Sequence, residues 1–367
     1  MTSGPRDGAI RVVPTVDACI RSRRGGFINP YRRGRCGDRG IGLDRATGRP
    51  ETFPAGIRLV ALRREMTESL PAGPAGHPWR RLLFGPSGLR AGWRLLVFLG
   101  ILALLFQLRD ALIRRSGGLD GAALYVFRQA TRFVFCLLAS ELMARFEGRS
   151  IADYGLPWRQ AFRRRFWQGM LIGFAALSLL LAVMGLAGAF HLGSVAISGA
   201  DVWKYGAAYG LICLVIGFSE EFYYRGYVQY TAAAGIGFWP AAVLLSAYFG
   251  LSHVGRATET WLGALNAGLG GLVLCLFLKR TGNLWLPIGF HTTFNWGQVY
   301  FYGVASSGVT VPGHLFRSSF SGPASLSGGT VGPEGSWLCT LLFVGIAVAF
   351  EATFRGRRAE PGSQVAT

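Results

Sequence analysis

Eight long apolar segments follow residue 90, and they constrain the fold more than any other feature of the chain. A helix needs about 20 apolar residues to cross the hydrocarbon core of a bilayer, and these segments have roughly that length. They are residues 93–109, 122–143, 167–190, 202–229, 238–254, 262–278, 284–303 and 336–354. The first is short and the second contains Arg128 and Arg132, which weakens the pattern in these two. The sequence therefore predicts an all-α, polytopic transmembrane helix bundle of about eight spans.

The composition and the charge distribution agree with this fold class. Hydrophobic residues make up 51% of the 367 residues and charged residues only 16%, whereas soluble domains carry about 25% charged residues. The formal net charge is +19, and most of the arginine clusters fall on one side if every segment crosses once. The positive-inside rule assigns that side to the cytoplasm, with both termini there. Nucleic-acid binding is not indicated, because the apolar segments show no aromatic and basic stripe.

The two ends of the chain differ from the apolar part. Residues 1–80 are rich in Arg, Gly and Pro and show no sustained hydrophobic period, which predicts a disordered basic tail. Residues 1–65 are expected to be dispensable or to precede the true start, for which Met66 is a candidate. The Gly/Ser/Pro-rich segment 304–335 carries few charges and is expected to be an extracytoplasmic loop before the last helix, 336–354.

Two further features indicate packing and carry no chemistry of their own. Small residues recur at helical spacing in segment 263–274, at Gly263, Ala267 and Gly271, and such a face lets another helix approach closely. The six cysteines form no C-x-x-C pair, so neither a disulfide framework nor a cysteine zinc site is expected.

Three short polar motifs lie within the apolar segments. The first runs from Glu220-Glu221 to Arg225, the second from Phe249 to His253, and the third from His291 to Asn295. An ionisable side chain inside a bilayer costs several kcal/mol and usually marks a functional site. From the helical rise, Glu220 and His291 are expected roughly 15 Å deep and His253 roughly 20 Å deep, so a shared site is geometrically allowed.

Helical periodicity predicts which side chains share a face. Glu221 can pair with its i+4 neighbour Arg225, while Tyr224 lies on the Glu220 face. Phe249 is expected to form a wall that restrains the imidazole of His253, and His291 and Asn295 are expected to point toward one reacting oxygen.

Together these groups are suited to amide hydrolysis. Glu220 is expected to activate water with help from His253, and His291 and Asn295 to stabilise the oxyanion. Taken singly, a buried histidine is more often structural, and the Glu221–Arg225 pair serves equally well to stabilise a helix. Two other functions stay open: a non-enzymatic immunity or scaffold protein that binds peptides in the same cavity, and a proton-coupled transporter. The transporter would favour an internal repeat, which the sequence does not show.

At these motifs the chain resembles the CPBP family of intramembrane proteases, the Abi branch related to type II CAAX prenyl endopeptidases. The family pattern, E-E-x-x-x-R, F-x-x-x-H and H-x-x-x-N/D, occurs here in order. Family-like stretches also occur at Arg225-Gly226, at 284–289 and at 152–156. The resemblance implies a helical catalytic core over residues 150–303, preceded by accessory helices at 90–145, in a bacterial inner membrane. It also implies the same roles for Glu220, His253, His291 and Asn295, with Glu221 and Arg225 completing the first motif.

The resemblance leaves metal dependence and substrate open. No cofactor is expected, although Glu220, His253 and His291 could together bind zinc or another divalent metal. An H-E-x-x-H motif is absent and Asn295 is a poor zinc ligand, which favours a glutamate mechanism without metal. The expected partners are membrane lipid and a membrane-associated peptide or protein. The sequence gives no reason to assume a prenylated substrate and does not indicate an oligomeric state.

Overall fold

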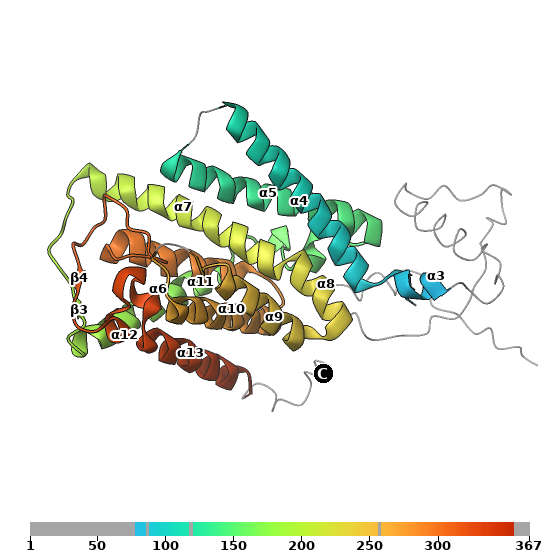
Figure 1. Ribbon diagram of the computed structural model, residues 1–367. Coiled ribbons are helices and arrows are strands. Elements are labelled where there is room, and N and C mark those ends of the chain that lie inside the picture. The colour runs from blue at the N-terminus through green and yellow to red at the C-terminus, as the bar shows by residue number, and fades with distance from the viewer. Residues whose placement is uncertain (1–77, 86–87, 117–119, 256–257, 356–367) are drawn as a thin grey trace, which may run out of the picture. The chain divides into compact units, whose positions relative to one another are not determined.

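The structure of the chain is a computed structural model that describes residues 78–355 apart from 86–87, 117–119 and 256–257 (Figure 1). The predicted tail, including Met66, lies outside the described residues except for 78–80, which open helix α3 (Pro78–Leu83). The chain divides into two units, Met1–Pro54 with Pro361–Thr367, and Ala55–Glu360. All described residues belong to the second unit.

The described residues form a helical bundle, as predicted. Its strands are only pairs of residues: β1 (Phe84–Gly85) with β2 (Gly88–Leu89), and β3 (Phe190–His191) with β4 (Ser319–Phe320), both antiparallel. The main helices are α4 (Ala91–Ser116), α5 (Gly121–Glu147), α6 (Arg164–Leu186), α7 (Ala200–Arg225), α8 (Tyr227–Ile236), α9 (Phe238–Leu251), α10 (Trp261–Thr281), α11 (Trp285–Trp296) and α13 (Trp337–Arg355).

Five of these segments are long and apolar enough to cross a membrane: α4, α5, α6, α7 continued by α8, and α10. The α9 and α13 helices are shorter, and α11 continues into a π-helical segment, Gly297–Tyr302. Large apolar side chains such as Leu104, Leu171 and Trp203 are exposed on the helices. Extensive apolar surface of this kind is rare in soluble monomers and suits contact with lipid. The predicted membrane bundle is thus confirmed, while crossing by α9, α11 and α13 stays a prediction.

Helices α6 and α11 pack closely against each other, backbone to backbone, through glycines. Gly169 and Gly173 of α6 face the backbone of α11, and Gly289 of α11 faces the backbone of α6 at Phe166. A Cβ at any of these positions would collide with a carbonyl or amide of the other helix. Small residues therefore permit this close crossing, which holds the third motif on α11 against the core.

Helices α9 and α10 also approach through small residues, as the sequence predicts for segment 263–274. The contacting row differs from the predicted one, however. Gly250 of α9 packs against Ala264 and Gly268, and Gly271 faces Arg225 and Ser246. Gly263 instead faces Glu259 and Val331. Of the two predicted glycines, Gly271 therefore lies in the contact and Gly263 does not.

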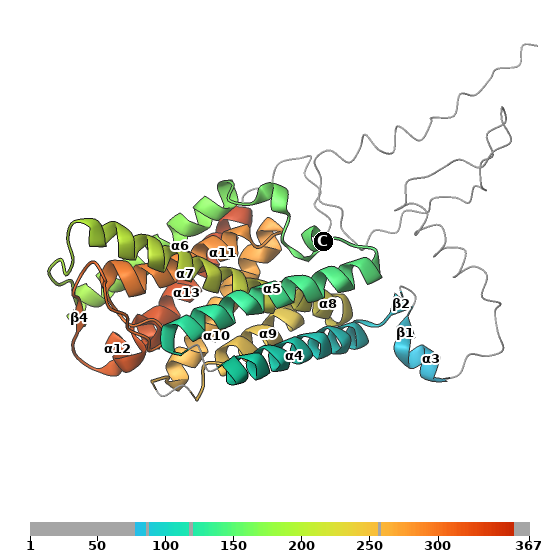
Figure 2. The ribbon, with the colours of Figure 1, turned by 90° about the horizontal axis from the view of Figure 1, so that it is seen from above.

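Helices α4 and α5 lie side by side along α7 and α8 (Figures 1 and 2). At the end of α5, the Glu147 carboxylate accepts hydrogen bonds from Arg94 Nη1 of α4 at 2.6 Å and from Tyr227 OH of α8 at 2.5 Å. Tyr154 OH of the following 3₁₀ turn (Ile151–Tyr154) also donates to Glu147, at 3.2 Å. This carboxylate therefore ties the accessory helices to the core.

Candidate active site

Glu220 lies near the end of α7, where the helix breaks at Gly226 before α8 begins. A Cβ at Gly226 would meet the Phe222 carbonyl and ring, so this break needs glycine. Glu220 is 7% exposed and lines a cavity of about 280 Å³. The cavity is lined by Phe106, Arg109, Arg128, Arg132, Glu220, Tyr223, Tyr224, Tyr248, Phe249, Ser252 and His253. The first and second sequence motifs thus meet at one cavity.

His253 lies in the turn just after α9, which ends at Leu251. The sequence predicts that His253 lies within a span at 238–254, but α9 ends two residues before His253. Its Nδ1 lies 2.8 Å from the Phe249 carbonyl oxygen, and the two rings meet edge to face at 4.9 Å. Phe249 therefore restrains the imidazole, as predicted. Because a carbonyl only accepts hydrogen bonds, Nδ1 carries the hydrogen, and the neutral ring presents Nε2 as an acceptor.

His291 of α11 joins the third motif to the first. Its Nδ1 lies 2.8 Å from Glu221 Oε1, and its Nε2 lies 3.9 Å from Glu220 Oε2. The two adjacent carboxylates therefore approach opposite nitrogens of one ring. Glu221 fixes the orientation of the imidazole, and the orientation directs Nε2 toward Glu220.

Glu221 and Arg225 form the predicted i, i+4 ion pair. Arg225 Nη1 lies 2.8 Å from Glu221 Oε1, and the two residues are 1% and 0% exposed. Arg225 Nε also donates to the Gly271 carbonyl of α10 at 3.3 Å, and its guanidinium lies over the Phe249 ring. A buried pair of this kind needs several partners to offset desolvation. These contacts link α7 to α9 and α10 directly behind the cavity.

Tyr224 and Asn295 differ in how closely they approach the site. Tyr224 lines the cavity, as its predicted position on the Glu220 face implies, and donates to Ser252 Oγ at 3.2 Å. Asn295 is half-buried one turn after His291 on α11, does not line the cavity, and has no hydrogen-bond partner among the described residues. The structure therefore places Asn295 beside His291 without bringing it into contact with Glu220 or His253.

Gln129 of α5 is a site residue that sequence analysis missed. It is 3% exposed, and its Nε2 lies 3.3 Å from Glu220 Oε1 while its Oε1 accepts from Ser219 Oγ at 3.0 Å. Arg132, one turn farther on, reaches the same Glu220 oxygen at 3.8 Å. The available signal was the polar group Arg128, Gln129 and Arg132 inside an apolar segment; of these, Arg128 and Arg132 were interpreted only as weakening the predicted span.

The donors at the site are not gathered around one point as metal ligands would be. Among the described residues, no three His, Cys, Asp or Glu side chains are placed to share a metal ion. The Nδ1 atoms of His253 and His291 are engaged by Phe249 and Glu221, respectively, which leaves their Nε2 atoms as the nitrogens that could bind a metal ion. Of the predicted zinc ligands, Glu220 and His253 line the cavity, whereas His291 is outside its lining and approaches Glu220 at 3.9 Å.

Residues 201–297 match the family model described as "Type II CAAX prenyl endopeptidase Rce1-like". The matched segment contains all three motifs and leaves α4, α5, α6 and α13 outside. No curated protein matches the chain. The five apolar helices and this match indicate a multi-pass membrane protein. The resemblance to type II CAAX prenyl endopeptidases is therefore confirmed over residues 201–297, the part of the chain that contains Glu220, His253 and His291.

Proposed function

We propose that this chain is an intramembrane endopeptidase that hydrolyses a peptide bond in a membrane-associated peptide or protein. One observation carries the proposal: Glu220 and His253 line the same cavity, and His291 Nε2 lies 3.9 Å from Glu220 Oε2. Side chains from α7, from the turn after α9 and from α11 thus lie close to Glu220. The match to an endopeptidase family supports this activity in general terms.

In the proposed first step, Glu220 accepts a proton from a water molecule in the cavity. His253 accepts a hydrogen bond from the same water through Nε2, because its Nδ1 hydrogen is donated to the Phe249 carbonyl. The water oxygen then bonds to the carbonyl carbon of the scissile peptide. Gln129 and Arg132 hold the Glu220 carboxylate in place through Oε1, which leaves Oε2 directed at His291.

The oxyanion formed by this attack needs preorganised donors. His291 donates through Nε2, and since its Nδ1 hydrogen is committed to Glu221, this role requires the doubly protonated imidazolium. Glu221 supplies the counter-charge, and the amide of Asn295 is the second donor. As the carbonyl re-forms, the C–N bond breaks and Glu220 passes its proton to the leaving nitrogen. These steps use only groups of the protein and a water molecule.

The cellular setting is part of the proposal. The charge distribution supports a multi-pass protein of a bacterial cytoplasmic membrane with both termini in the cytoplasm. Its substrate would be a peptide or protein that enters the bilayer or lies on it. A prenyl group on that substrate is not assumed.

The test is cleavage of a proteome-derived peptide library by the full chain in non-ionic detergent, with products identified by mass spectrometry. The Glu220→Gln substitution preserves side-chain shape but removes the base, so cleavage is expected to fall by about 10²–10⁴-fold. Glu141→Gln is the matched control, because Glu141 is 41% exposed and pairs only with the surface residue Arg145. Cleavage by Glu220→Gln at the wild-type rate would refute the assigned base. A wild-type protein that binds peptides but cuts none would favour the non-enzymatic binder.

A further inference from the structure

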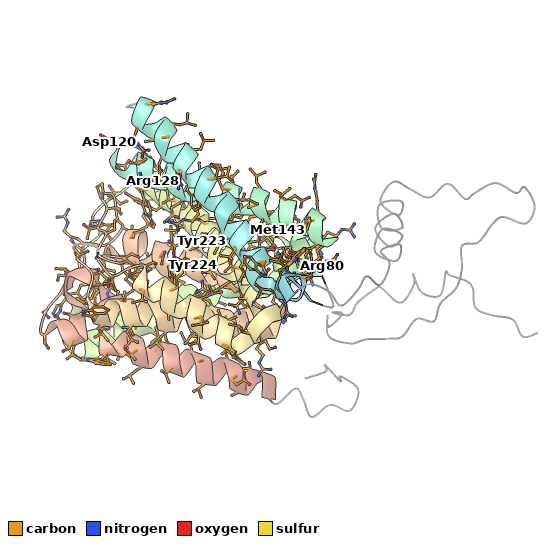
Figure 3. All side chains as sticks on the ribbon, turned by 45° about the vertical axis from the view of Figure 1, so that its right-hand side comes forward. Arg80, Asp120, Arg128, Met143, Tyr223 and Tyr224 are labelled. Atoms are coloured by element: carbon orange, nitrogen blue, oxygen red, sulfur yellow. The ribbon has the colours of Figure 1, made fainter. Side chains whose placement is uncertain are left out.

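The cavity that contains Glu220 has two chemically different walls. The wall from α7, α9 and the following turn carries Glu220, His253 and three tyrosines. The wall from α4 and α5 carries three arginines, Arg109, Arg128 and Arg132. Figure 3 labels three of these lining residues, Arg128, Tyr223 and Tyr224. Three guanidinium groups and a single carboxylate therefore line the same space.

The acidic partners of these arginines do not balance their charge. Arg109 Nε and Arg128 Nε approach the same Asp110 oxygen, at 3.0 and 3.7 Å. Arg132 lies 3.8 Å from Glu220, the proposed base. Two carboxylates thus serve three guanidinium groups, and the Arg128 side chain remains 49% exposed. Because uncompensated cations are costly within a membrane protein, this surplus points to an anionic ligand.

Aromatic rings hold two of these guanidinium groups in place. Arg109 lies over the Phe106 ring at 5.0 Å, and Arg132 lies over the Tyr223 ring at 5.6 Å. Such cation–π contacts fix the direction of a long side chain and reduce the entropy lost on binding. Two of the three arginines are therefore held in place before any ligand arrives, and the exposed Arg128 side chain lies between them in sequence.

We propose that this wall, centred on Arg128, binds a carboxylate of the substrate peptide and so selects where the peptide is cut. A guanidinium group binds a carboxylate through two parallel hydrogen bonds, which gives both affinity and orientation. The inference deepens the proposed endopeptidase function and rests on it. It assigns a specificity role to α4 and α5, which lie outside the matched family segment.

The geometry predicts the position of this carboxylate along the substrate. Arg128 and Arg132 are one helical turn apart, about 6 Å, and Arg132 is 3.8 Å from Glu220. An extended peptide advances about 3.3–3.6 Å per residue, so the carboxylate lies about two or three residues from the scissile bond. It can belong to an acidic side chain or to the C-terminus of the substrate. A phospholipid phosphate fits less well, because this wall and the proposed base share one small cavity.

The first experiment uses one peptide that the wild type cleaves in the library assay. It is remade with its acidic residues changed to amides, with an amidated C-terminus, and with both changes. In the wild type, loss of the recognised carboxylate is expected to raise KM at least tenfold with little change in kcat. In Arg128→Gln, the original and amidated peptides are expected to have the same KM. Arg145→Gln is the control, because Arg145 lies on α5 with its side chain 78% exposed and outside the cavity lining.

A second measurement does not depend on cleavage. Calorimetry compares binding of acetyl-trialanine with a free carboxylate, of its amide, and of a version with a central aspartate and an amidated end. The wild type is expected to bind at least one carboxylate form tenfold more tightly than the plain amide, and Arg128→Gln to lose this preference. Arg128→Lys, which keeps the charge but loses the two-pronged geometry, is expected to be intermediate and replaces Arg128→Gln if that variant does not fold.

The outcomes separate the two proposals. Carboxylate preference in binding with no cleavage of any peptide would support this site and refute the endopeptidase. Cleavage that is indifferent to every carboxylate would overturn the inference and leave the endopeptidase standing. If added phosphatidylglycerol bound in an Arg128-dependent way while acid and amide peptides bound alike, the wall would be a lipid site and the inference would be wrong.

Discussion

His291 Nδ1 lies 2.8 Å from Glu221 Oε1, and Arg225 Nη1 approaches that same oxygen at 2.8 Å. One buried carboxylate oxygen therefore serves both a structural ion pair and the proposed oxyanion donor. The adjacent Glu220 reaches the other nitrogen of His291. Consecutive glutamates on one helix thus divide their tasks because their side chains diverge by about 100° around the helix axis.

We predict that Glu221→Gln lowers kcat by at least about 10²-fold, the lower bound for loss of a positioned acid or base. The imidazole of His291 loses the counter-charge that its imidazolium form needs, although Glu220 is untouched. The variant is also expected to lose stability, because removing one partner of a buried ion pair costs about 3–5 kcal/mol. The measurements are single-turnover cleavage per folded protein and the melting temperature in detergent.

Arg225→Met is the matched variant for this prediction. It breaks the same ion pair but keeps the contact between Glu221 and His291. We expect it to lose comparable stability and to keep a larger share of the cleavage rate. Equal loss of rate in both variants would mean that Glu221 acts only through the ion pair.

A second prediction concerns Gln129, which donates to Glu220 Oε1 at 3.3 Å. Gln129→Met keeps the side-chain volume and removes the amide, so Glu220 loses a positioning hydrogen bond and Ser219 loses an acceptor. A hydrogen bond to a charged group contributes about 1.5–3 kcal/mol, and since this one is long, the lower end applies and kcat is expected to fall about tenfold. Gln168→Met, which loses a single bond to Arg165 far from the cavity lining, is expected to keep its rate. An unchanged kcat in Gln129→Met would show that the Gln129 amide does not position Glu220.

The third prediction links helix packing to the site through Gly271. A Cβ there would lie 2.8 Å from Arg225 Nη2 and 3.1 Å from Ser246 Oγ. Gly271→Ala is therefore expected to displace the guanidinium group, and with it Glu221 and His291. The cleavage rate per folded molecule is expected to fall clearly, while the melting temperature changes little. Gly100→Ala on α4 is the control, because a Cβ there meets nothing within 4 Å, and it is expected to leave cleavage unchanged. A Gly271→Ala protein with normal cleavage would show that Arg225 shifts without consequence.

Much of this arrangement follows from sequence periodicity and the membrane setting. Long apolar segments predict the helices, and i, i+4 spacing predicts the Glu221–Arg225 pair and the contact of Phe249 with His253, since these relationships are local. The sequence predicts that Glu220, His253 and His291 lie close together, because polar side chains in a membrane bundle are more stable in contact with one another than in contact with lipid. In the structure Glu220 lines a cavity with His253 and lies 3.9 Å from His291.

The contacts that the sequence could not predict are those between distant helices. Gln129 and Glu220 are 91 residues apart, and nothing in the α5 sequence indicates that it packs against α7. The arginine wall depends on the same packing. The end of α9 at Leu251 was also missed, because hydropathy averages over a window and does not detect the turn that begins at Ser252. His253 therefore lies beyond the helix, where the turn directs it into the cavity.

A fourth prediction concerns metal dependence. Since the described residues bring no three ligands together, we predict that cleavage by the purified chain persists after treatment with 1,10-phenanthroline and extensive dialysis. Metal analysis of the same sample is expected to show no stoichiometric zinc. Loss of cleavage that returns on adding zinc, but not on removing the chelator alone, would show that Glu220, His253 and His291 rearrange around a metal.

A fifth prediction separates stability from catalysis at Glu147, whose carboxylate accepts hydrogen bonds from Arg94, Tyr154 and Tyr227, which lie on three different elements. Glu147→Gln leaves the Arg94 guanidinium without its counter-charge, and it is expected to cost about 3–5 kcal/mol of folding free energy. Cleavage per folded molecule should change little, because Glu147 does not line the cavity. Glu141→Gln on the same helix, with an exposed partner, is expected to cost about 0–1 kcal/mol.

The pH dependence of this cluster follows from Tyr154. Burial, followed by the nearby Glu147 charge, raises the pKa of the Tyr154 phenol above its usual value. The folded state therefore favours the protonated phenol, so the stability that it contributes is complete at neutral pH and is lost only as the pH rises into the strongly alkaline range. Melting temperatures of wild type and Tyr154→Phe should accordingly differ by a constant amount between about pH 6 and 9, well below the usual tyrosine pKa. A difference that shrinks across that interval would show that the phenol ionises early, and that Glu147 holds α4, α5 and α8 together without it.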